Sequence, residues 1–410
     1  MRTNRKENGR MCGKTEGQNM KEKERAEQLF AVIDAMAEEY TDLWIRLCSF
    51  ETRSDDFEAL NHQSDYLEEY ALAHGLAVKR TSYPAAGDSL QLTLPENAAS
   101  SQDAPIVILG HMDTVHEKGV FGEPPVRREG NMLYGPGVAD MKGGVVVALL
   151  ALEALRKTGL PHPEIRLVLN PDEESGEHLG GEVRKNLHVE PARGCKAAFN
   201  CETGCPGAMT VGRKGVLRVA IDVEGIGAHA GNNYFDGASA IREMACKILA
   251  IEKESREDGL TFNCGKIEGG TVVNIVPTAC HMEIDIRFLN EKQYEEALAI
   301  IKRETEHACV PGTKATWSIL HMLPAMEDTE DNRKLFAKVA AFASEYELET
   351  LTPIVRGGGS DSAFTTGIGI PTVCSMGAVG AYVHTVREEA QIDSLPRRAK
   401  ILAGVIAFRV

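Results

Sequence analysis

Histidines and carboxylates follow three strand-like segments of this sequence within a few residues. The segments PIVILG (105–110), EIRLVLN (164–170) and AAFNCE (197–202) have the pattern of buried strands. The residues at their ends that could do chemistry are His111 and Asp113, Glu173 and Glu174, and Glu202. Because ligands bind at the carboxyl edge of an open parallel sheet, we expect these side chains to face one crevice. Imidazole and carboxylate groups are ligands that zinc takes in proteins.

Two further residues extend this candidate ligand set. Asp140 lies in GPGVADMKGG, just before a predicted helix, and His384 lies in a loop after the strand-like segment IPTVCSM. Two metals about 3.5–4 Å apart need a bridging group, and Asp140 is a natural candidate. Adjacent acids such as Glu173 and Glu174 repel each other in a buried crevice unless a cation lies between them. One such segment alone is usually a solvated turn, but their joint occurrence at consecutive strand ends favours a metal site.

The pattern around these segments predicts the sheet that must position them. GGVVVALLALEALRKTG (143–159) has the pattern of a helix that ends at Gly159. Strands that alternate with helices predict an α/β domain whose mostly parallel sheet is covered on both faces. Residues 325–410 return to the same alternation and should complete this sheet.

Between these parts the pattern changes to the order β-α-β-β-α-β, the ferredoxin-like arrangement. The elements expected are strands at 216–225, 261–267, 279–289 and 314–320, and helices at about 237–253 and 291–306. We therefore predict an inserted α+β domain at 208–322. The catalytic domain would consist of residues 25–207 and 323–410.

The composition of the sequence bears on the binding partners and on the cellular compartment that we expect. The 410 residues include 45 basic and 60 acidic side chains, a formal net charge of -15, which argues against nucleic acid or an anionic membrane as the main partner. No run approaches the roughly 20 apolar residues that span a bilayer. Residues 1–24 are polar and contain no apolar signal core, so we expect a disordered tail and a cytoplasmic protein. Of the ten cysteines, the cluster Cys195, Cys201 and Cys205 could form a site, but isolated reduced thiols are the better interpretation.

Nine short motifs occur in the order seen in the aminoacylase/carboxypeptidase family of co-catalytic zinc hydrolases. They are GHMDTV (110–115), GPGVADMKGG (135–144), NPDEESGE (170–177), CETG (201–204), GAHAG (227–231), VVNIVP (272–277), DIR (285–287), GGGSDSAF (357–364) and HT (384–385). The sequence resembles this family over about residues 30–410. Its segment SLPRRAKILAGVI (394–406) resembles the glutamate carboxypeptidase, or carboxypeptidase G-like, branch.

The resemblance implies a role for each candidate in the catalytic domain. It implies two zinc ions per chain, for which Co²⁺ or Mn²⁺ could substitute. The five implied ligands are His111 and Glu202 on one ion, Glu174 and His384 on the other, and Asp140 bridging both. Asp113 would orient the imidazole of His111. Glu173 would be the general base that takes a proton from water and returns it to the leaving amine.

The resemblance also implies roles for residues outside the ligand set. From its neighbours alone, His229 could simply fill a tight turn, whereas the family pattern makes it a donor to the oxyanion. An arginine in an alternating strand is more often an exposed ion-pair partner, but Arg287, with Asn274, resembles the clamp for the substrate carboxylate. The glycine run before Ser360 lacks the lysine of a phosphate-binding loop. We therefore expect Gly358 and Ser360 to approach the substrate.

These features predict a two-zinc hydrolase that cleaves an amide bond next to a free carboxylate, most like a glutamate carboxypeptidase. The substrate would be a small peptide or an N-acyl amino acid. A deacylase of the acetylornithine or succinyl-diaminopimelate type shares the metal core and stays open, as does a di- or tripeptidase. A non-catalytic binding protein on this scaffold would have lost Glu173 or His384, and a redox role for Cys201 lacks a partner. The resemblance further implies a homodimer through the inserted domains, with His229 reaching the neighbouring active site.

Overall fold

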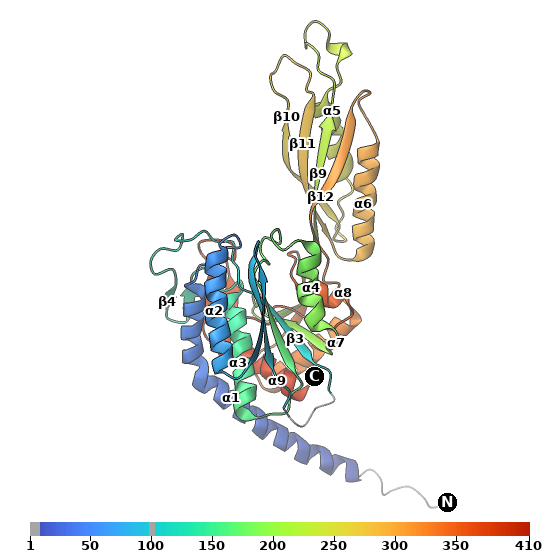
Figure 1. The fold of residues 1–410 in the computed structure, drawn as a ribbon. Helices are drawn as coiled ribbons and strands as arrows, with labels where there is room; N and C mark the ends of the chain where they lie inside the picture. Colours follow the sequence, from blue (N-terminus) through green and yellow to red (C-terminus); the bar gives the residue numbers. More distant parts are fainter. Residues whose placement is uncertain (1–8, 98–102) are drawn as a thin grey trace, which may run out of the picture. The chain divides into compact units, whose positions relative to one another are not determined.

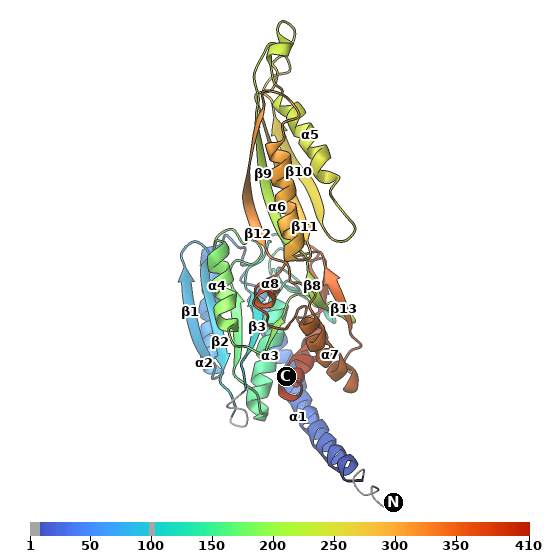
Figure 2. The same ribbon diagram turned by 90° about the vertical axis from the view of Figure 1, so that its right-hand side faces the viewer.

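The computed structural model of the protein describes residues 9–97 and 103–410 (Figures 1 and 2). The chain forms two compact units. The large unit contains Met1–Thr210, Glu330–Ile354 and Ile370–Val410, and the small unit contains Val211–Thr329 and Val355–Gly369. Both stretches of the small unit are therefore inserted into the chain of the large unit.

The large unit is built on a six-stranded sheet with the order β1-β2-β6-β3-β7-β14 (Figure 1). Its strands are β1 (Ala77–Tyr83), β2 (Gly87–Leu94), β3 (Ile106–His111), β6 (Ile165–Asn170), β7 (Ala197–Asn200) and β14 (Thr372–Val373). β3 runs parallel to β6 and β7, and β14 runs parallel to β7. The hairpin of β1 and β2 joins β6 in antiparallel fashion. The predicted sheet with parallel central strands is confirmed.

Helices cover both faces of this sheet, because its central strands are apolar on both sides. The helices of the large unit are α1 (Gly9–Cys48), α2 (Phe57–Ala73), α3 (Lys142–Thr158), α4 (Gly181–Ala192), α7 (Glu330–Glu345) and α9 (Ser394–Phe408). A Cβ on Gly110 of β3 would lie 3.3 Å from Val145 of α3, and α1 and α9 pack on α3. On the opposite face, Val107 of β3 shares a buried cluster with Leu187 of α4.

Helix α1 reaches into the segment that the sequence suggested was a tail. Residues 1–8 of that segment lie outside the described residues, whereas residues 9–24 are the first turns of α1. The run MKEKERAEQLF (20–30) favours helix at the end of this segment, because lysine, glutamate, arginine, glutamine, alanine and leucine all have high helix propensity. Although α1 is 40 residues long, neither it nor any other helix in the described ranges is apolar enough to cross a membrane.

Two smaller sheets are built from loops and short strands. A four-stranded sheet has the order β15-β16-β5-β4. Its strands are β4 (Arg127–Glu129), β5 (Met132–Tyr134), β15 (Gly380–Ala381) and β16 (Glu389–Gln391). β8 (Ala208–Arg213) pairs with β13 (Thr352–Arg356). The four-stranded sheet brings the segment after His384 next to the segment before Asp140, because β16 pairs with β5.

The small unit has the predicted β-α-β-β-α-β order. Its elements are β9 (Gly215–Glu224), α5 (Ala240–Glu252), β10 (Thr261–Gly269), β11 (Ala279–Phe288), α6 (Glu291–Glu306) and β12 (Lys314–Leu323), with the short helices η1 (Tyr234–Asp236) and α8 (Ser362–Gly367). All pairs in the sheet β10-β11-β9-β12 are antiparallel. Alternate strand residues such as Ile221 and Ile284 form the core with α5 and α6. This confirms the α+β fold of the predicted insertion. The small unit differs from the predicted bounds of 208–322, because it contains Val211–Thr329 and Val355–Gly369.

Candidate metal centre

His111 ends strand β3 and is almost completely buried, with 1% of its side chain exposed. Its Nδ1 lies 3.3 Å from Oδ1 of Asp113. Its Nε2 lies 3.4 Å from Oδ1 of Asp140 and 3.9 Å from Oε1 of Glu202. β3 lies between β6 and β7 in the sheet, so the three strand ends meet as predicted. One nitrogen of the imidazole thus faces Asp113, and the other faces two further carboxylates.

Asp113 ties the end of β3 to the loop after β6. Its carboxylate is fully buried and accepts a hydrogen bond from the hydroxyl of Ser54 at 2.7 Å. It also accepts the backbone N–H groups of Glu173 at 3.1 Å and Glu174 at 3.0 Å. Burial alone would raise the pKa of Asp113, but His111 and these donors lower it. These contacts place Asp113 beside the imidazole of His111, and its role in orienting that ring stays a prediction.

His384 lies close to both Asp140 and Glu174, although it is more than 200 residues away from them in the sequence. Nε2 of His384 lies 3.3 Å from Oδ2 of Asp140 and 3.1 Å from Oε2 of Glu174. His384 has a φ of 62°, a left-handed conformation that is uncommon outside glycine. Asp140 therefore contacts His111 with one oxygen and His384 with the other, which is the arrangement required of a bridging residue.

The side chain of Glu173 faces different partners from the side chain of Glu174. Its Oε1 lies 3.3 Å from the guanidinium of Arg184, a nearly buried residue of α4. Glu173 also belongs to a group with His111 and Glu202 whose candidate ligand atoms lie within 4.8 Å of one another. The two adjacent acids therefore have different surroundings, although both lie at the same cluster.

The pKa directions show how strongly these groups interact. Burial alone would raise the pKa of Asp140, but the imidazoles of His111 and His384 hold it far below its usual range. Burial raises the pKa of Glu174 to about 7, and the charge of Asp140 adds to the increase. Asp140 and then Glu174 raise the pKa of His384 to about 11. Burial alone would lower the pKa of His111, but Asp113 and Asp140 raise it well above its usual range. Positive charge is therefore stabilised between these groups.

The cluster fits a divalent cation by its donor set. His111, Asp140 and Glu174 form one group of candidate ligands within 4.8 Å of one another, and the group with Glu173 and Glu202 is the second. Nε2 of His111 and Oδ1 of Asp140 are buried and face each other without hydrogen-bond geometry, and neither has another hydrogen-bond partner among the described residues. Nitrogen and carboxylate donors of this kind suit zinc and other hard or borderline cations.

The other predicted site residues lie in the small unit. His229 is exposed, and its Nδ1 accepts the backbone N–H groups of Gly231 and Asn232, both at 3.1 Å. The carbonyl of Asn274 accepts the N–H of Ala230 at 3.0 Å, so these two predicted residues lie on neighbouring loops. Because Nδ1 of His229 is an acceptor, a neutral ring carries its proton on Nε2.

Arg287 has the ion-pair environment that its strand position suggested. Its Nε and one Nη lie 2.6 Å and 3.0 Å from the two carboxylate oxygens of Asp285. Ser360 is buried, and its hydroxyl accepts the N–H of Ser362 at the start of α8. The carbonyl of Gly358 faces Arg213, but a Cβ on Gly358 would meet little. These residues remain predicted substrate contacts.

Comparison with known proteins decides the family. The sequence profile of peptidase family M20/M25/M40 matches residues 107–407, which include every residue of the cluster. The chain belongs to this family. It is therefore a hydrolytic enzyme of a metal-dependent peptidase family, and the chemistry predicted from its strand ends is confirmed at that level.

Individual relatives of this M20/M25/M40 peptidase have several different names. The chain is 27% identical to carboxypeptidase G2 of Pseudomonas sp. strain RS-16 over 368 residues, which cover 88% of this chain and 87% of the relative. It is 27% identical to the succinyl-diaminopimelate desuccinylase of Stenotrophomonas maltophilia, over 75% of this chain and 85% of the relative. The aminopeptidase PepT of Bacillus cereus has the same fold, with a TM-score of 0.76 and 23% identity over 90% of this chain and 98% of that one.

Several residues of this peptidase's site escaped the sequence analysis. Ser54, Arg184 and Glu388 contact, respectively, Asp113, Glu173 and the backbone of the Asp140 loop. Ser54 and Arg184 lie in segments without a motif, so no spacing could have indicated them. Glu388 follows His384 by four residues, in HTVREE, and an acid so close to a candidate ligand was a usable signal.

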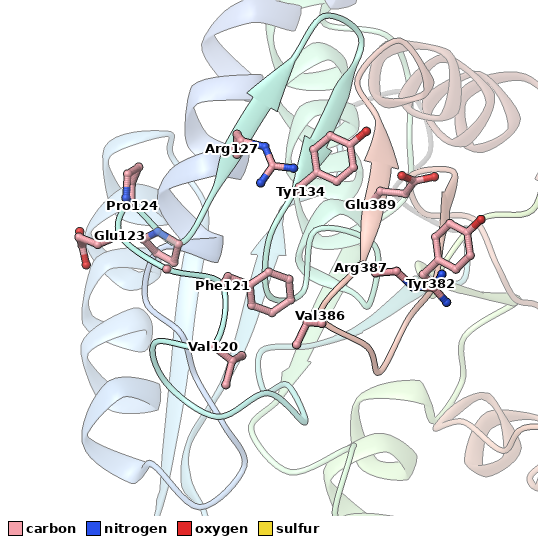
Figure 3. Close-up of a pocket in the computed structure, with 12 residues that line it drawn as sticks. Val120, Phe121, Glu123, Pro124, Arg127, Tyr134, Tyr382, Val386, Arg387 and Glu389 are labelled. Atoms are coloured by element: carbon pink, nitrogen blue, oxygen red, sulfur yellow. The ribbon is translucent and has the colours of Figure 1, made fainter.

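A cavity of about 740 Å³ opens in the large unit beside the loop that carries His384 (Figure 3). Its wall is mostly aromatic and apolar, with Phe121, Tyr134, Tyr382 and Val386, and it includes two arginines and two glutamates, Arg127, Arg387, Glu123 and Glu389. Tyr382 and Val386 stand two residues to either side of His384. The guanidinium of Arg387 lies over the ring of Tyr382 at 4.6 Å. The cavity therefore offers aromatic rings and charged groups of both signs beside the loop that carries His384.

Proposed function

We propose that this M20/M25/M40 peptidase is a two-zinc, glutamate carboxypeptidase-like hydrolase that cleaves an amide bond next to a free carboxylate. The observation that carries this proposal is the position of Asp140 between His111 and His384, with one carboxylate oxygen facing each imidazole. The extended similarity to carboxypeptidase G2 supports the carboxypeptidase branch.

The ligands divide between two zinc ions in this proposal. His111 and Glu202 would hold one ion, Glu174 and His384 would hold the other, and Asp140 would be a ligand of both. When bound, the ions supply Lewis acidity toward the substrate carbonyl and toward water. The opposed contacts of Asp140 support the bridge, and the 3.1 Å approach of His384 to Glu174 supports their assignment to one ion.

Glu173 acts as the general base in this scheme. Its carboxylate receives a proton from water and returns it to the leaving amine. Arg184 supports this role, because its guanidinium lies 3.3 Å from one oxygen of the carboxylate and can orient it. The backbone bond from Glu173 to Asp113 holds the base in register with His111.

The small unit supplies recognition. His229 donates from Nε2 to the carbonyl oxygen as charge develops on it, and the two backbone donors on Nδ1 support that tautomer. Arg287 and Asn274 bind the free carboxylate of the substrate, and Gly358 and Ser360 line its path. Asp285 already aligns the planar guanidinium of Arg287, which a second carboxylate can approach along another edge.

The acyl half of the substrate occupies the cavity beside His384. This cavity is lined by Tyr382 and Val386, which lie two residues to either side of the proposed metal ligand His384. Its aromatic wall favours a flat acyl group over a small aliphatic one, because planar groups stack on aromatic rings and guanidinium planes.

A release assay tests the proposal. Zinc-loaded protein is given N-acyl amino acids in which the amine half is glutamate, aspartate, ornithine or diaminopimelate and the acyl half is acetyl, succinyl or benzoyl. We expect the highest kcat/KM with glutamate and benzoyl. We also expect poor turnover of the glutamate α-amide, and loss of all activity after chelation. A clear preference for succinyl-diaminopimelate would instead favour the second candidate, a desuccinylase, which the Stenotrophomonas relative makes reasonable.

A further inference from the structure

Glu388 is a buried carboxylate that lies beside the ligand cluster without belonging to it. Its side chain is 1% exposed. Oε1 accepts the backbone N–H of Ala139 at 2.8 Å and of Asp140 at 3.0 Å, and Oε2 accepts the N–H of Gly137 at 3.3 Å. Burying a carboxylate is costly unless hydrogen-bond donors replace water. Here those donors come from one loop, the loop that carries Asp140.

The same residue holds the segment that carries His384. The N–H of Glu388 donates to the carbonyl of Thr385 at 3.0 Å, which closes the turn after His384. The carbonyl of Glu388 accepts the N–H of Gly135 at 3.4 Å. Side chain and backbone of Glu388 thus join the 384–388 turn to the 135–140 loop, from which His384 and Asp140 approach each other to 3.3 Å.

His116 extends this connection to a third segment. Its Nε2 lies 2.6 Å from Oε2 of Glu388, and only 7% of its side chain is exposed. The ring of His116 also packs edge-on against Phe121 of the cavity wall, with centroids 4.9 Å apart. His116 follows His111 by five residues, so the Glu388–His116 pair reaches all three segments that carry His111, Asp140 and His384.

The loop that carries Asp140 depends on such a connection, because it has no regular hydrogen-bond pattern of a helix or a sheet. Residues 135–141 form neither helix nor strand. Other side chains hold its carbonyls: Trp44 donates to Val138 at 3.0 Å, and Thr203 donates to Ala139 at 3.1 Å. Glu388 holds three of its N–H groups. Its backbone geometry, and hence the place of Asp140, therefore depends on contacts from distant parts of the chain as well as on its own bonds from Val138 to Gly135 and from Lys142 to Gly137.

We propose that Glu388 is a positioning residue that sets the spacing of Asp140 and His384 and, through His116, their place relative to His111. It acts through backbone N–H groups and an imidazole rather than on the reacting atoms. When Glu388 is present, Asp140 and His384 already have the spacing that a metal ion needs. When Glu388 is altered, part of the binding free energy must be used to order these ligands. The affinity for the metal should therefore depend on Glu388. This inference rests on the proposed metal centre.

Glu388→Gln tests the proposal against a matched control. The glutamine side chain has the same shape as glutamate. Its NH2 group, however, cannot accept the hydrogen bonds that a carboxylate oxygen accepts from the backbone N–H groups of the loop. Glu349→Gln is the control, because Glu349 is also a largely buried carboxylate of the large unit and accepts a backbone N–H, that of Gly207, at 2.9 Å. Affinity for Zn²⁺ is measured by competition with a chromophoric chelator, the Co²⁺ absorption spectrum reports ligand geometry, and the thermal melting of the metal-free proteins reports stability.

We expect Glu388→Gln to weaken Zn²⁺ binding by roughly 10- to 100-fold, as is usual for a partner that orients ligands, and to alter the Co²⁺ spectrum. Glu349→Gln should lose stability with wild-type affinity and spectrum. If Glu388→Gln fails to fold, His116→Gln should show a smaller loss of affinity in the same direction. Unchanged affinity in the folded variants, or an equal loss in the control, overturns the positioning role. A wild-type protein that binds neither ion would overturn the metal centre as well.

Discussion

At the scale of single residues, one buried carboxylate organises the cluster. Asp113 faces Nδ1 of His111 and accepts the N–H groups of both Glu173 and Glu174. This arrangement turns two adjacent acids in different directions: Glu173 toward Arg184, and Glu174 toward His384. Neighbours in sequence can therefore have separate functions, because the loop after β6 presents their side chains to different partners.

Glu173→Gln and Glu174→Gln should have different effects. A base is not needed to hold metal, so Glu173→Gln should lower kcat by about 10²- to 10⁴-fold with two metal ions still bound. Glu174→Gln removes a ligand and should lower the metal content. Elemental analysis after dialysis, together with initial rates, distinguishes the variants. Equal metal content and equal activity in the two proteins would show that the roles are wrongly assigned.

Arg287→Ala should weaken recognition of the free carboxylate. Loss of a hydrogen bond to a charged group costs roughly 1.5–3 kcal/mol, which corresponds to about 10- to 100-fold in kcat/KM. Arg218→Ala is the matched control, because Arg218 lies on the same sheet and its Nε is 3.8 Å from the same Asp285. Rates on acid and α-amide substrates would be compared. If the two variants behave alike, or if the wild type does not prefer the acid, Arg287 is not the clamp.

At the scale of elements, close packing of α3 brings two ligand-bearing segments together. A Cβ on Gly144, in the first turn of α3, would lie 1.7 Å from the carbonyl oxygen of Cys201. The helix therefore contacts the backbone directly after β7, where Glu202 follows. Because Asp140 lies just before α3, this contact fixes the distance between the Asp140 loop and Glu202. Gly144 thus has a packing role.

Gly144→Ala should therefore reduce both stability and metal affinity. Alanine normally favours a helix by up to about 1 kcal/mol over glycine, so a net loss must come from overpacking, which typically costs roughly 1–3 kcal/mol. Gly181→Ala, in the first turn of α4, is the control, because a Cβ there has no neighbour within 4 Å. Thermal melting and Zn²⁺ titration would be measured. A Gly144→Ala protein as stable as the control would contradict the packing argument.

At the scale of the whole molecule, the chain divides its candidate functions between two units. The large unit contains the whole predicted ligand set, whereas the small unit contains His229, Asn274 and Arg287. The small unit has features that suit the proposed homodimer. β12 is an edge strand with exposed Leu320 and Met322. Exposed apolar edge strands are sites where a second copy can pair.

Mixing two inactive variants tests whether His229 acts on the neighbouring subunit. His229→Ala keeps the metal site and Glu173, and Glu173→Gln keeps His229. In a mixed dimer, one site then receives its donor from the partner. After co-refolding of equal amounts, random pairing should return about a quarter of wild-type activity, since about half of the dimers are mixed and each has one complete site. Mixed dimers without recovered activity would show that His229 acts within its own chain or not at all.

The main elements and the chemical types of the candidate site could be predicted from the amino-acid pattern. Apolar runs predicted the strands β3, β6 and β7. The residues that follow these strands in the sequence also lie at the ends of the strands in the fold, so they predicted much of the cluster. The β-α-β-β-α-β order of the small unit followed from periodicity in the same way. The distant groups that hold these residues in place became visible in the folded chain and not before. Glu388 bonds Ala139 across 249 residues and Ser54 bonds Asp113 across 59. Such pairs carry no periodic signal, because they depend on loops that meet only after the sheet has formed.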